Sequence, residues 1–304
     1  MITILAGGSG SSKLIRGISK ATDDTINIIS NVGDNIWMFG LYVCPDIDTI
    51  TYTLSENLDI SKGWGVKDDS FKFLDEYKKY DSDTWFNLGD RDLAIHVFRT
   101  NLKNKGMKLS EITRIITKKL DVKHNIIPAS DDLIQTMFST DAGRLNLQEF
   151  WVKNHGKNNI VEINYDGIKN ANPADGVVEI LNQSDRIIFA NGNPVSSIGP
   201  IIKIPQIMET IKKCSAHKIA ISPIIGSSPV SGPAGQMLSA IGYETSPFGI
   251  ATYYSELIDS LIINDTDKNY STSIRDLNIE PIIGNIIMSD DTTEIELSKI
   301  CLDM

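Results

Sequence analysis

The chain has 304 residues, of which 41% are hydrophobic and 22% charged, which is the composition of a globular domain and excludes a disordered chain. Its formal net charge is -10, so it lacks the basic surplus with which proteins neutralise DNA or RNA. No apolar run is long enough for a signal-peptide core or a membrane span, and the three cysteines form no CxxC pair. We therefore expect a cytoplasmic protein with no nucleic-acid partner and no membrane partner.

The beginning of the chain predicts a strand, a glycine turn and a helix. Ile2–Ala6 is a continuous apolar run that ends in Gly7-Gly8-Ser9-Gly10, and helical spacing follows over Lys13–Lys20. Ile26–Ser30 is the next apolar run. Continuous apolar strands are typical of a parallel sheet that is covered on both faces. These segments predict an α/β fold with a Rossmann-like, doubly wound, mostly parallel sheet.

The glycine turn has the chemistry of a phosphate-binding loop. Gly7, Gly8 and Gly10 let backbone N–H groups approach a phosphate, and the following helix N-terminus adds partial positive charge. Lys13 adds a full charge. The spacing matches neither the P-loop nor GxGxxG, since Lys13 stands where the last glycine of GxGxxG belongs. A tight turn that binds nothing is the alternative interpretation.

Acidic and amide side chains follow the second strand. Asn31 comes directly after this strand, at the edge where doubly wound folds bind ligands, and Asp34 follows it closely. Asp46 and Asp48 come after Pro45, which stiffens the turn. Two carboxylates separated by one residue can share a divalent cation or activate a hydroxyl. Ordinary turn or cap chemistry is the alternative, but these turns are expected at the same end of the sheet, which favours a site.

A stretch of helical periodicity interrupts the sheet. Three segments mix charged and apolar residues at helical period: Ser70–Tyr80, Asp92–Lys105, and Ser110–Leu120 with Ser110 as N-cap. We predict one domain over 1–304, with a Rossmann-like core at about 1–67 and 152–304 and a mainly helical insertion at about 68–151. Strands are expected again at Arg186–Ala190, Lys218–Ile221, Ser260–Ile263 and near Ile283–Ile287, and a last helix around Glu294–Cys301.

Two short motifs near this stretch have both a functional and a structural interpretation. Arg91, flanked by Asp90 and Asp92, can be held rigidly for contact with an anion or a ring carbonyl, or the motif is a helix start capped by Asp90. Trp64, between two glycines, can stack on a flat ring, although ordinary packing is the alternative. The four histidines share no metal-ligand spacing, so surface or core roles are expected for them.

Two loops rich in Gly, Pro, Ser and Asn follow later strands. Proline stiffens such loops, while hydroxyl and backbone N–H groups suit phosphates and a nucleobase. Two such loops at one sheet edge predict a nucleotide cleft, and merely tight connections are the alternative. The candidate binding residues are Asn193 and Ser197 in the loop 190–200, and Gly226, Ser231 and Gly232 in the loop 222–235.

The ordered combination of these motifs resembles the 2-phospho-L-lactate transferase (CofD) family of deazaflavin coenzyme F-420 biosynthesis. The likeness extends in order over about the first 255 residues and is more specific than any single motif. The matching segments include Gly7-Gly8-x-Gly10, Asn31 with Trp37, Pro45–Thr49, Gly63-Trp64-Gly65, Leu88–Asp92, Pro128-x-Ser130-Asp131-Asp132, Asn193-Pro194, Ser197–Pro200, Ser222–Gly226 and Pro229–Gly235.

The resemblance implies substrates and a cofactor. The acceptor would be the deazaflavin Fo, and the donor lactyl-2-diphospho-5′-guanosine or an enolpyruvyl relative, with GMP as leaving group and Mg2+ required. Asp48 and Arg91 match Fo-contacting positions of the family, and Trp64 is placed with them. The glycine turn and the two late loops would surround the guanosine diphosphate portion. We expect a homodimer, since twofold symmetry is the commonest state of soluble oligomers.

Two departures from the family pattern fall in the loops assigned to the donor. The chain has Ala190-Asn191-Gly192-Asn193-Pro194 where the family often has Gly-Pro-Ser-Asn-Pro, and Gln236 where many members have Lys. Both leave the exact donor open. Two other functions also stay open: a nucleotide-sugar-binding regulatory relative without catalysis, and a nicotinamide-dependent oxidoreductase, which the missing GxGxxG disfavours.

The expected mechanism is an alignment of two substrates with charge neutralisation. Asp46 and Asp48 are expected to hold Mg2+ across the diphosphate, one of them also orienting the attacking hydroxyl, while Arg91 positions the acceptor. Asp48→Asn is expected to cut turnover strongly while leaving the fold intact.

Overall fold

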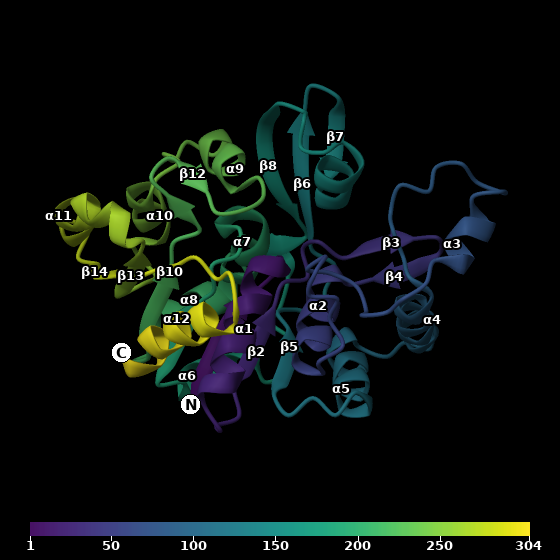
Figure 1. The fold of residues 1–304 in the computed structure, drawn as a ribbon, viewed down its shortest axis with the longest axis horizontal. Helices are drawn as coiled ribbons and strands as arrows, with labels where there is room; N and C mark the ends of the chain where they lie inside the picture. The colour runs from purple at the N-terminus through teal and green to yellow at the C-terminus, as the bar shows by residue number, and fades with distance from the viewer.

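A seven-stranded parallel sheet forms the centre of the molecule, whose computed structural model describes residues 1–304 (Figure 1). Every pair of neighbouring strands in it is parallel. From one edge to the other, the strands are β14 (Glu280–Ile283), β13 (Ser260–Ile263), β10 (His217–Ile221), β9 (Arg186–Phe189), β1 (Ile2–Ala6), β2 (Asn27–Ser30) and β5 (Asn125–Pro128).

The strand order has a switch point between β1 and β9. From β1 the chain adds β2 and β5 on one side, and from β9 it adds β10, β13 and β14 on the other. The loops that leave β1 and β9 therefore diverge and open a crevice at their carboxyl ends. This arrangement confirms the predicted α/β, Rossmann-like, doubly wound fold, and it places the glycine turn and the Ala190–Pro194 loop at the crevice.

Helices pack in pairs against the sheet. Helix α1 (Gly8–Ala21) packs against α2 (Pro45–Leu54) and α12 (Asp291–Asp303), and α6 (Val177–Gln183) packs against α8 (Pro205–Lys213). The contact between α1 and α12 is close because a Cβ at Gly17 would lie 2.4 Å from the Glu294 carbonyl oxygen. The other α-helices that follow β9 in the sequence are α7 (Gly199–Ile202), α9 (Ala234–Ala240), α10 (Pro247–Tyr254) and α11 (Ser271–Arg275).

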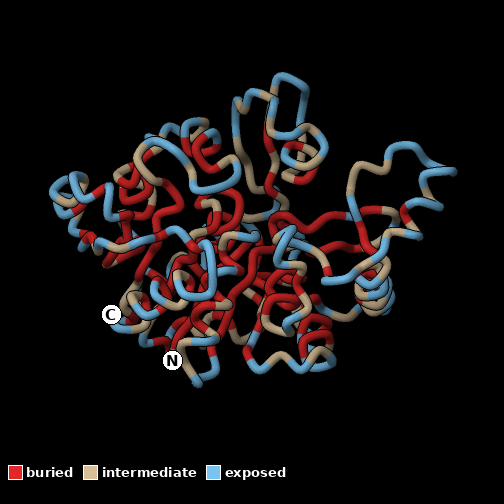
Figure 2. The backbone as a smooth tube through the Cα atoms, in the orientation of Figure 1, coloured by how far each residue is buried: buried red, intermediate tan, exposed pale blue.

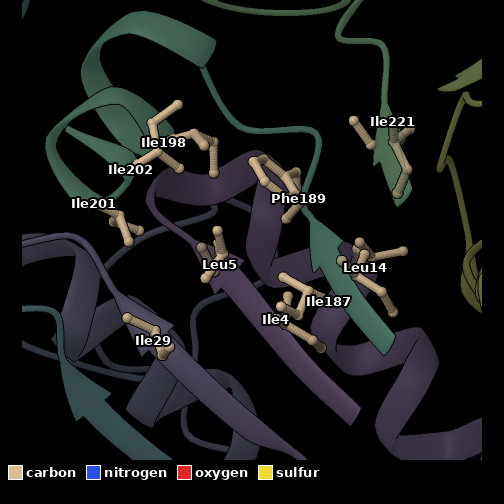
Figure 3. Packing of buried hydrophobic residues seen from close by; sticks show 14 of the residues in the cluster. Ile4, Leu5, Leu14, Ile29, Ile187, Phe189, Ile198, Ile201, Ile202 and Ile221 are labelled. Carbon is tan, nitrogen blue, oxygen red and sulfur yellow. The ribbon is translucent and has the colours of Figure 1, made fainter. Parts of the chain in front are cut away.

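The core consists mainly of isoleucine side chains from the central strands and the helices that cover them. Ile4, Leu5, Ile187 and Phe189 are fully buried, and Figure 3 shows them on the neighbouring strands β1 and β9. Figure 2 shows burial concentrated along the central strands, while the projecting segments are exposed. β-branched residues suit strands that are buried on both faces, which explains why these apolar runs predict the sheet well.

The segment 68–151 differs from the predicted helical insertion. Its three helices lie where expected, as α3 (Lys72–Tyr77), α4 (Asp90–Asn104) and α5 (Leu109–Lys119), although α5 begins before Ser110. Asn125–Pro128 then returns as β5 at the edge of the central sheet, so the segment is not one insertion. This short run carries only two isoleucines, too weak a pattern to predict a strand from sequence.

Three small sheets lie outside the central one. β6 (Gln135–Thr140) pairs with β7 (Gly143–Asn146) and β8 (Ile160–Asp166), and Figure 1 shows this sheet projecting at the top. A hairpin of β3 (Ile36–Met38) and β4 (Leu41–Val43) leads toward α3 and α4. The third sheet pairs β11 (Ile224–Ile225) with β12 (Ser228–Pro229).

The boundaries of the last strand and the last helix also differ from the prediction. β14 ends at Ile283, where the expected strand began, and α12 begins at Asp291, earlier than expected, with Asp290 capping its N-terminus. None of the helices combines the length and apolar character that crossing a membrane requires.

Candidate functional site

A cleft of about 420 Å³ opens at the carboxyl ends of β1 and β9, the position that the strand order predicts for a ligand. Its walls come from the glycine turn, the first turn of α2, the 63–65 turn, α4 and the two late loops. Among the predicted site residues, the cleft is lined by Gly7, Gly8, Gly10, Asp46, Asp48, Trp64, Asn193, Ser197, Ser231 and Gly232.

The glycine turn is packed so closely that larger residues do not fit. A Cβ at Gly7 would lie 2.6 Å from Asp46 Oδ2 and 3.0 Å from the Ser197 Cβ, and Gly8 has φ +73°. A Cβ at Gly192 would lie 2.7 Å from the Gly7 carbonyl oxygen. The turn after β1 and the loop after β9 therefore touch at the start of α1, and the N-terminus of α1 lies at the cleft, as in phosphate-binding turns.

Asn31 joins two buried carboxyl groups behind this turn. Its Nδ2 donates to Asp34 Oδ2 and to Asp46 Oδ2, each at 2.8 Å. Burial raises the pKa of Asp46 to about 6, and burial together with the Asp46 charge raises the pKa of Asp34 well above its usual range. The expected position of Asn31, Asp34 and Asp46 at the same end of the sheet is confirmed, and the nearness of the two carboxyl groups disfavours a full negative charge on both.

Asp48 lies apart from Asp46, in a buried ion pair. Pro45 is the first residue of α2, so Asp46 and Asp48 belong to a helical turn and face different partners. Arg99 Nη1 donates to Asp48 Oδ2 at 3.0 Å, and Arg99 Nη2 donates to Oδ1. Side-chain exposure is 5% for Asp48 and 1% for Arg99. Both carboxylate oxygens of Asp48 are thus engaged.

A chain of polar side chains continues from Arg99 along α4. Arg99 Nη1 donates to His96 Nδ1 at 3.0 Å, which leaves the imidazole proton on Nε2. That Nε2 lies 3.0 Å from Asp92 Oδ1, which also accepts a hydrogen bond of 2.5 Å from Tyr52 Oη. Burial raises the pKa of Asp92, but His96 and Tyr52 outweigh it and the pKa falls below its usual value. Asp92 is therefore a carboxylate at the cleft.

Aromatic side chains cover another part of the same cleft. Trp64 and Trp151 line it with 40% and 42% of their surface exposed, and Phe86 lies among the lining residues. Gly63 and Gly65 both have positive φ, at +75° and +72°, so glycine is favoured on each side of Trp64. Lys62 Nζ lies over the Trp64 ring, 5.7 Å from its centre. Partly exposed tryptophans in a cleft suit a flat ring system.

Four predicted residues lie outside this cleft, one of them Asn31, which lies behind the glycine turn. Arg91 is exposed, and its Nη1 donates to the Lys67 carbonyl oxygen at 2.8 Å. The Gly226 N–H donates to Asp267 Oδ1 at 3.0 Å. Lys13 lines a neighbouring cavity instead.

Several lining residues were not predicted from sequence. His96 was assigned a surface or core role, Tyr52 and Trp151 were not singled out, and Asn191 was named only as a departure from the family pattern. One signal was available for α4: Asp92, His96 and Arg99 are spaced four and three residues apart, which puts them on one helix face. No comparable pattern marks Trp151, which follows β7 in an irregular helical turn.

The residues of the cleft only partly fit the expected Mg2+. No group of three carboxylate, imidazole or thiolate side chains lies close enough to hold a metal. Asp48 does not fit, because Arg99 occupies both its oxygens. Asp46 fits better, since it lines the cleft beside the glycine turn, and Mg2+ often uses one or two carboxylates with substrate phosphates.

Comparison with known proteins gives one consistent result. The family model described as 2-phospho-L-lactate transferase CofD matches residues 2–295, beyond the 255 residues of the motif resemblance. Proteins named 2-phospho-L-lactate transferase are similar over nearly the whole chain. One from Methanococcoides burtonii is 35% identical and covers 97% of this chain and 96% of its own. One from Methanocaldococcus jannaschii is 33% identical, and the match covers 98% of this chain and 96% of that protein.

Among solved structures, a UPF0052 family member from Bacillus halodurans has a similar fold. Its TM-score is 0.66 at 13% identity, and the match covers 99% of this chain and 98% of the other. At this identity the likeness concerns the fold alone.

Proposed function

The chain belongs to the 2-phospho-L-lactate transferase CofD family, and on this premise we propose that it transfers a 2-phospholactyl group, or a related phospho-acid group, to the deazaflavin Fo. The donor is lactyl-2-diphospho-5′-guanosine and the leaving group is GMP, within the biosynthesis of coenzyme F-420. One observation carries the proposal: a single cleft holds a glycine turn suited to phosphates, a buried carboxylate and two partly exposed tryptophans suited to a flat ring.

The acceptor ring lies against Trp64 and Trp151 in this proposal. The ring system of a deazaflavin is flat and largely apolar, and its ribityl chain is polar. Stacking of a ring on the indoles directs the ribityl chain toward the polar lining, which includes Asp92. Arg91 remains a candidate for the acceptor, from its match to the family pattern.

The transfer is a displacement at phosphorus. The terminal ribityl hydroxyl attacks the phosphorus that bears the lactyl group, a new P–O bond forms, and the P–O bond to GMP breaks with its electron pair leaving on GMP. Asp92 accepts the hydroxyl proton, because it lines the cleft as a carboxylate and its contacts with Tyr52 and His96 hold its Oδ1 in place. Backbone N–H groups of the turn Gly7–Gly10 and the hydroxyl of Ser197 stabilise charge on the phosphoryl oxygens in this scheme.

Asp48 acts through Arg99 in this scheme and is a positioning residue. The pair fixes the guanidinium that donates to His96, and His96 in turn lies against Asp92.

A divalent cation fits the charge of the cleft. Three aspartates and no lysine or arginine line it, so an anionic diphosphate needs a counter-charge there. Asp46 would hold Mg2+ there together with the phosphates of the donor, and the cation would supply that charge and polarise the phosphoryl group.

Binding of Fo, followed by its fluorescence with and without GDP and Mg2+, tests the proposal. Saturable binding that responds to GDP supports both sites. Binding of a nucleotide-sugar with no binding of Fo contradicts it and favours the regulatory relative.

Asp92→Asn provides a sharper test of the mechanism. Removal of a general base costs roughly 10²-fold or more in rate. We expect transfer by Asp92→Asn to fall by about that factor while Fo binding stays within about threefold. Asp175→Asn, at an exposed position, is the matched control. Full activity of Asp92→Asn would rule out its assigned role.

A further inference from the structure

One wall of the cleft comes from a connector that is separate from the central sheet. The connector, residues 147–159, joins β7 to β8 in the small sheet that projects from the molecule (Figure 1). Four of its residues line the cleft: Leu147, Gln148, Trp151 and Val152. Its first part is anchored by Phe150, which is fully buried. The position of Trp151 also depends on how the second part is held.

That second part contains a tight turn, residues 154–158, which packs against the Trp151 ring. His155 and Gly156 have positive φ, at 55° and 63°, and the Gly156 N–H donates to the Phe150 carbonyl oxygen at 2.9 Å. A Cβ at Gly156 would lie 2.8 Å from Trp151 Cζ3 and 2.9 Å from Cε3. Glycine therefore lets the backbone approach the ring closely. A shift of this turn must move the indole or open a gap beside it.

Gln236, on α9, holds the turn. Its Nε2 donates to the Asn158 carbonyl oxygen at 2.9 Å. Its Oε1 lies 3.9 Å from the position that a Cβ would take at Gly156, so it sits beside the backbone that contacts the indole. α9 packs against β8 and is anchored in the main core by Met237 and Leu238. The hydrogen bond thus connects the turn to a firmly held helix.

The other hydrogen bonds and ion pairs around the turn do not reach the main core. Asn159 donates to both carboxylate oxygens of Asp141, at the tip of the β6–β7 hairpin. Lys153 pairs with Asp83 at 2.8 Å, and exposed ion pairs of this kind contribute little. Gln236 therefore provides the hydrogen bond that fastens the turn to the body of the molecule.

Gln236 itself lies outside both cavities at the glycine turn. Its side chain is exposed, and it lines neither the cleft nor the neighbouring cavity, although residues 231–234 just before it line the cleft. The sequence places Gln236 among the departures from the family pattern in the loops assigned to the donor. In the structure its side chain contacts the turn beside Trp151 instead, which places its effect on the aromatic wall.

We propose that Gln236 is a positioning residue, which holds the 154–158 turn against Trp151 and so keeps the indole in place for the flat ring of the acceptor. The identity of that acceptor rests on the proposed function. Stacked rings have centres about 4.5–7 Å apart in an offset arrangement, so an indole that is free to shift stacks less well. Gln236 acts on the acceptor through Trp151 and does not touch it.

Calorimetric binding of Fo and GDP to Gln236→Glu tests the proposal. Glutamate keeps the shape of the side chain, but its carboxylate cannot donate to the Asn158 carbonyl oxygen. Fo affinity should fall about 3- to 10-fold, a large part of what stacking on one aromatic side chain contributes, while GDP affinity stays within about twofold. Gln206→Glu, the same change at an exposed position in the first turn of α8, is the matched control and should alter neither affinity.

The same change in a Trp151→Ala background separates positioning from a general structural effect. With no indole left to position, Gln236→Glu should change Fo affinity by less than about twofold. Hydrogen exchange then measures the fastening of the turn without any ligand. Peptides that cover residues 150–158 should exchange at least about threefold faster in Gln236→Glu, because the turn opens more often.

Each outcome decides for or against the proposal. Unchanged Fo affinity in Gln236→Glu overturns it, as does an equal loss for Fo and GDP, which would assign Gln236 to the donor. An equal loss of Fo affinity with and without Trp151, or unchanged exchange over 150–158, overturns it too. If exchange rises as expected but the unmodified protein binds no Fo, the fastening of the indole stands and the transferase proposal fails.

Discussion

Removal of the Arg99 guanidinium tests the buried ion pair at the base of the cleft. In Arg99→Met the carboxylate of Asp48 stays buried, but it loses the two hydrogen bonds that it accepts from the Arg99 guanidinium. Breaking a buried pair by removing one partner costs about 3–5 kcal/mol, a large part of a total stability of about 5–15 kcal/mol. Asp48→Asn leaves the Arg99 charge unpaired and should cost a similar amount. The expectation that Asp48→Asn spares the fold therefore conflicts with the structure.

Urea unfolding followed by tryptophan fluorescence measures these effects. The double variant Asp48→Asn/Arg99→Met should lose less stability than either single variant, because it leaves no unpaired charge. Arg144→Met is the matched control: its bond to Asp166 is at the surface, and it should cost about 1 kcal/mol or less. Single-variant losses below about 1 kcal/mol, additive in the double variant, would refute the role of the pair.

Three further predictions concern the cleft and the acid stability of the chain. Trp151→Ala should weaken Fo by about 5- to 30-fold, since stacking on an aromatic side chain contributes about 1–2 kcal/mol; Trp37→Ala, exposed but outside the cleft, is the control, and equal effects would contradict the stacking role. Gly7→Ala should lower GDP affinity at least tenfold and cost about 1–3 kcal/mol, because its Cβ meets Asp46 Oδ2 at 2.6 Å. Gly284→Ala is its control: the added Cβ contacts only the end of the flexible Ile300 side chain, so GDP binding should change little. Burial, with the charge of Lys123, lowers the pKa of His124, so its stabilising contribution is present above about pH 6.5 and is lost as pH falls below it. Urea midpoints of the unchanged protein should thus drop more between pH 7.5 and pH 5.5 than those of His124→Gln, and parallel curves would contradict the assignment.

The central sheet was predictable because its strands carry a strong signal. Ile2–Ala6 and Ser260–Ile263 are continuous apolar runs, and the structure has strands over the same residues. β5 was missed because it is a short edge strand, and the half-exposed β6–β8 sheet lacks a continuous apolar run. Packing against the rest of the fold, rather than local pattern, determines these elements.

The candidate site was predictable in its backbone and less so in its side-chain partners. Glycine turns signal where the backbone must approach a ligand, so Gly7 and Gly8 were found. The separation of Asp46 from Asp48 was not visible, because it depends on α2 beginning at Pro45 and on Arg99, far along the chain. Long-range pairs such as Asp48–Arg99 leave no mark in local spacing.

Product analysis by mass spectrometry tests the central claim most directly. The protein is incubated with Fo, lactyl-2-diphospho-5′-guanosine and Mg2+, and both the deazaflavin and the nucleotide are identified. We predict that Fo gains one phospholactyl group and that GMP appears in equal amount. Unchanged Fo beside intact donor, in protein that binds both, would contradict the assignment of this chain as a transferase acting on Fo.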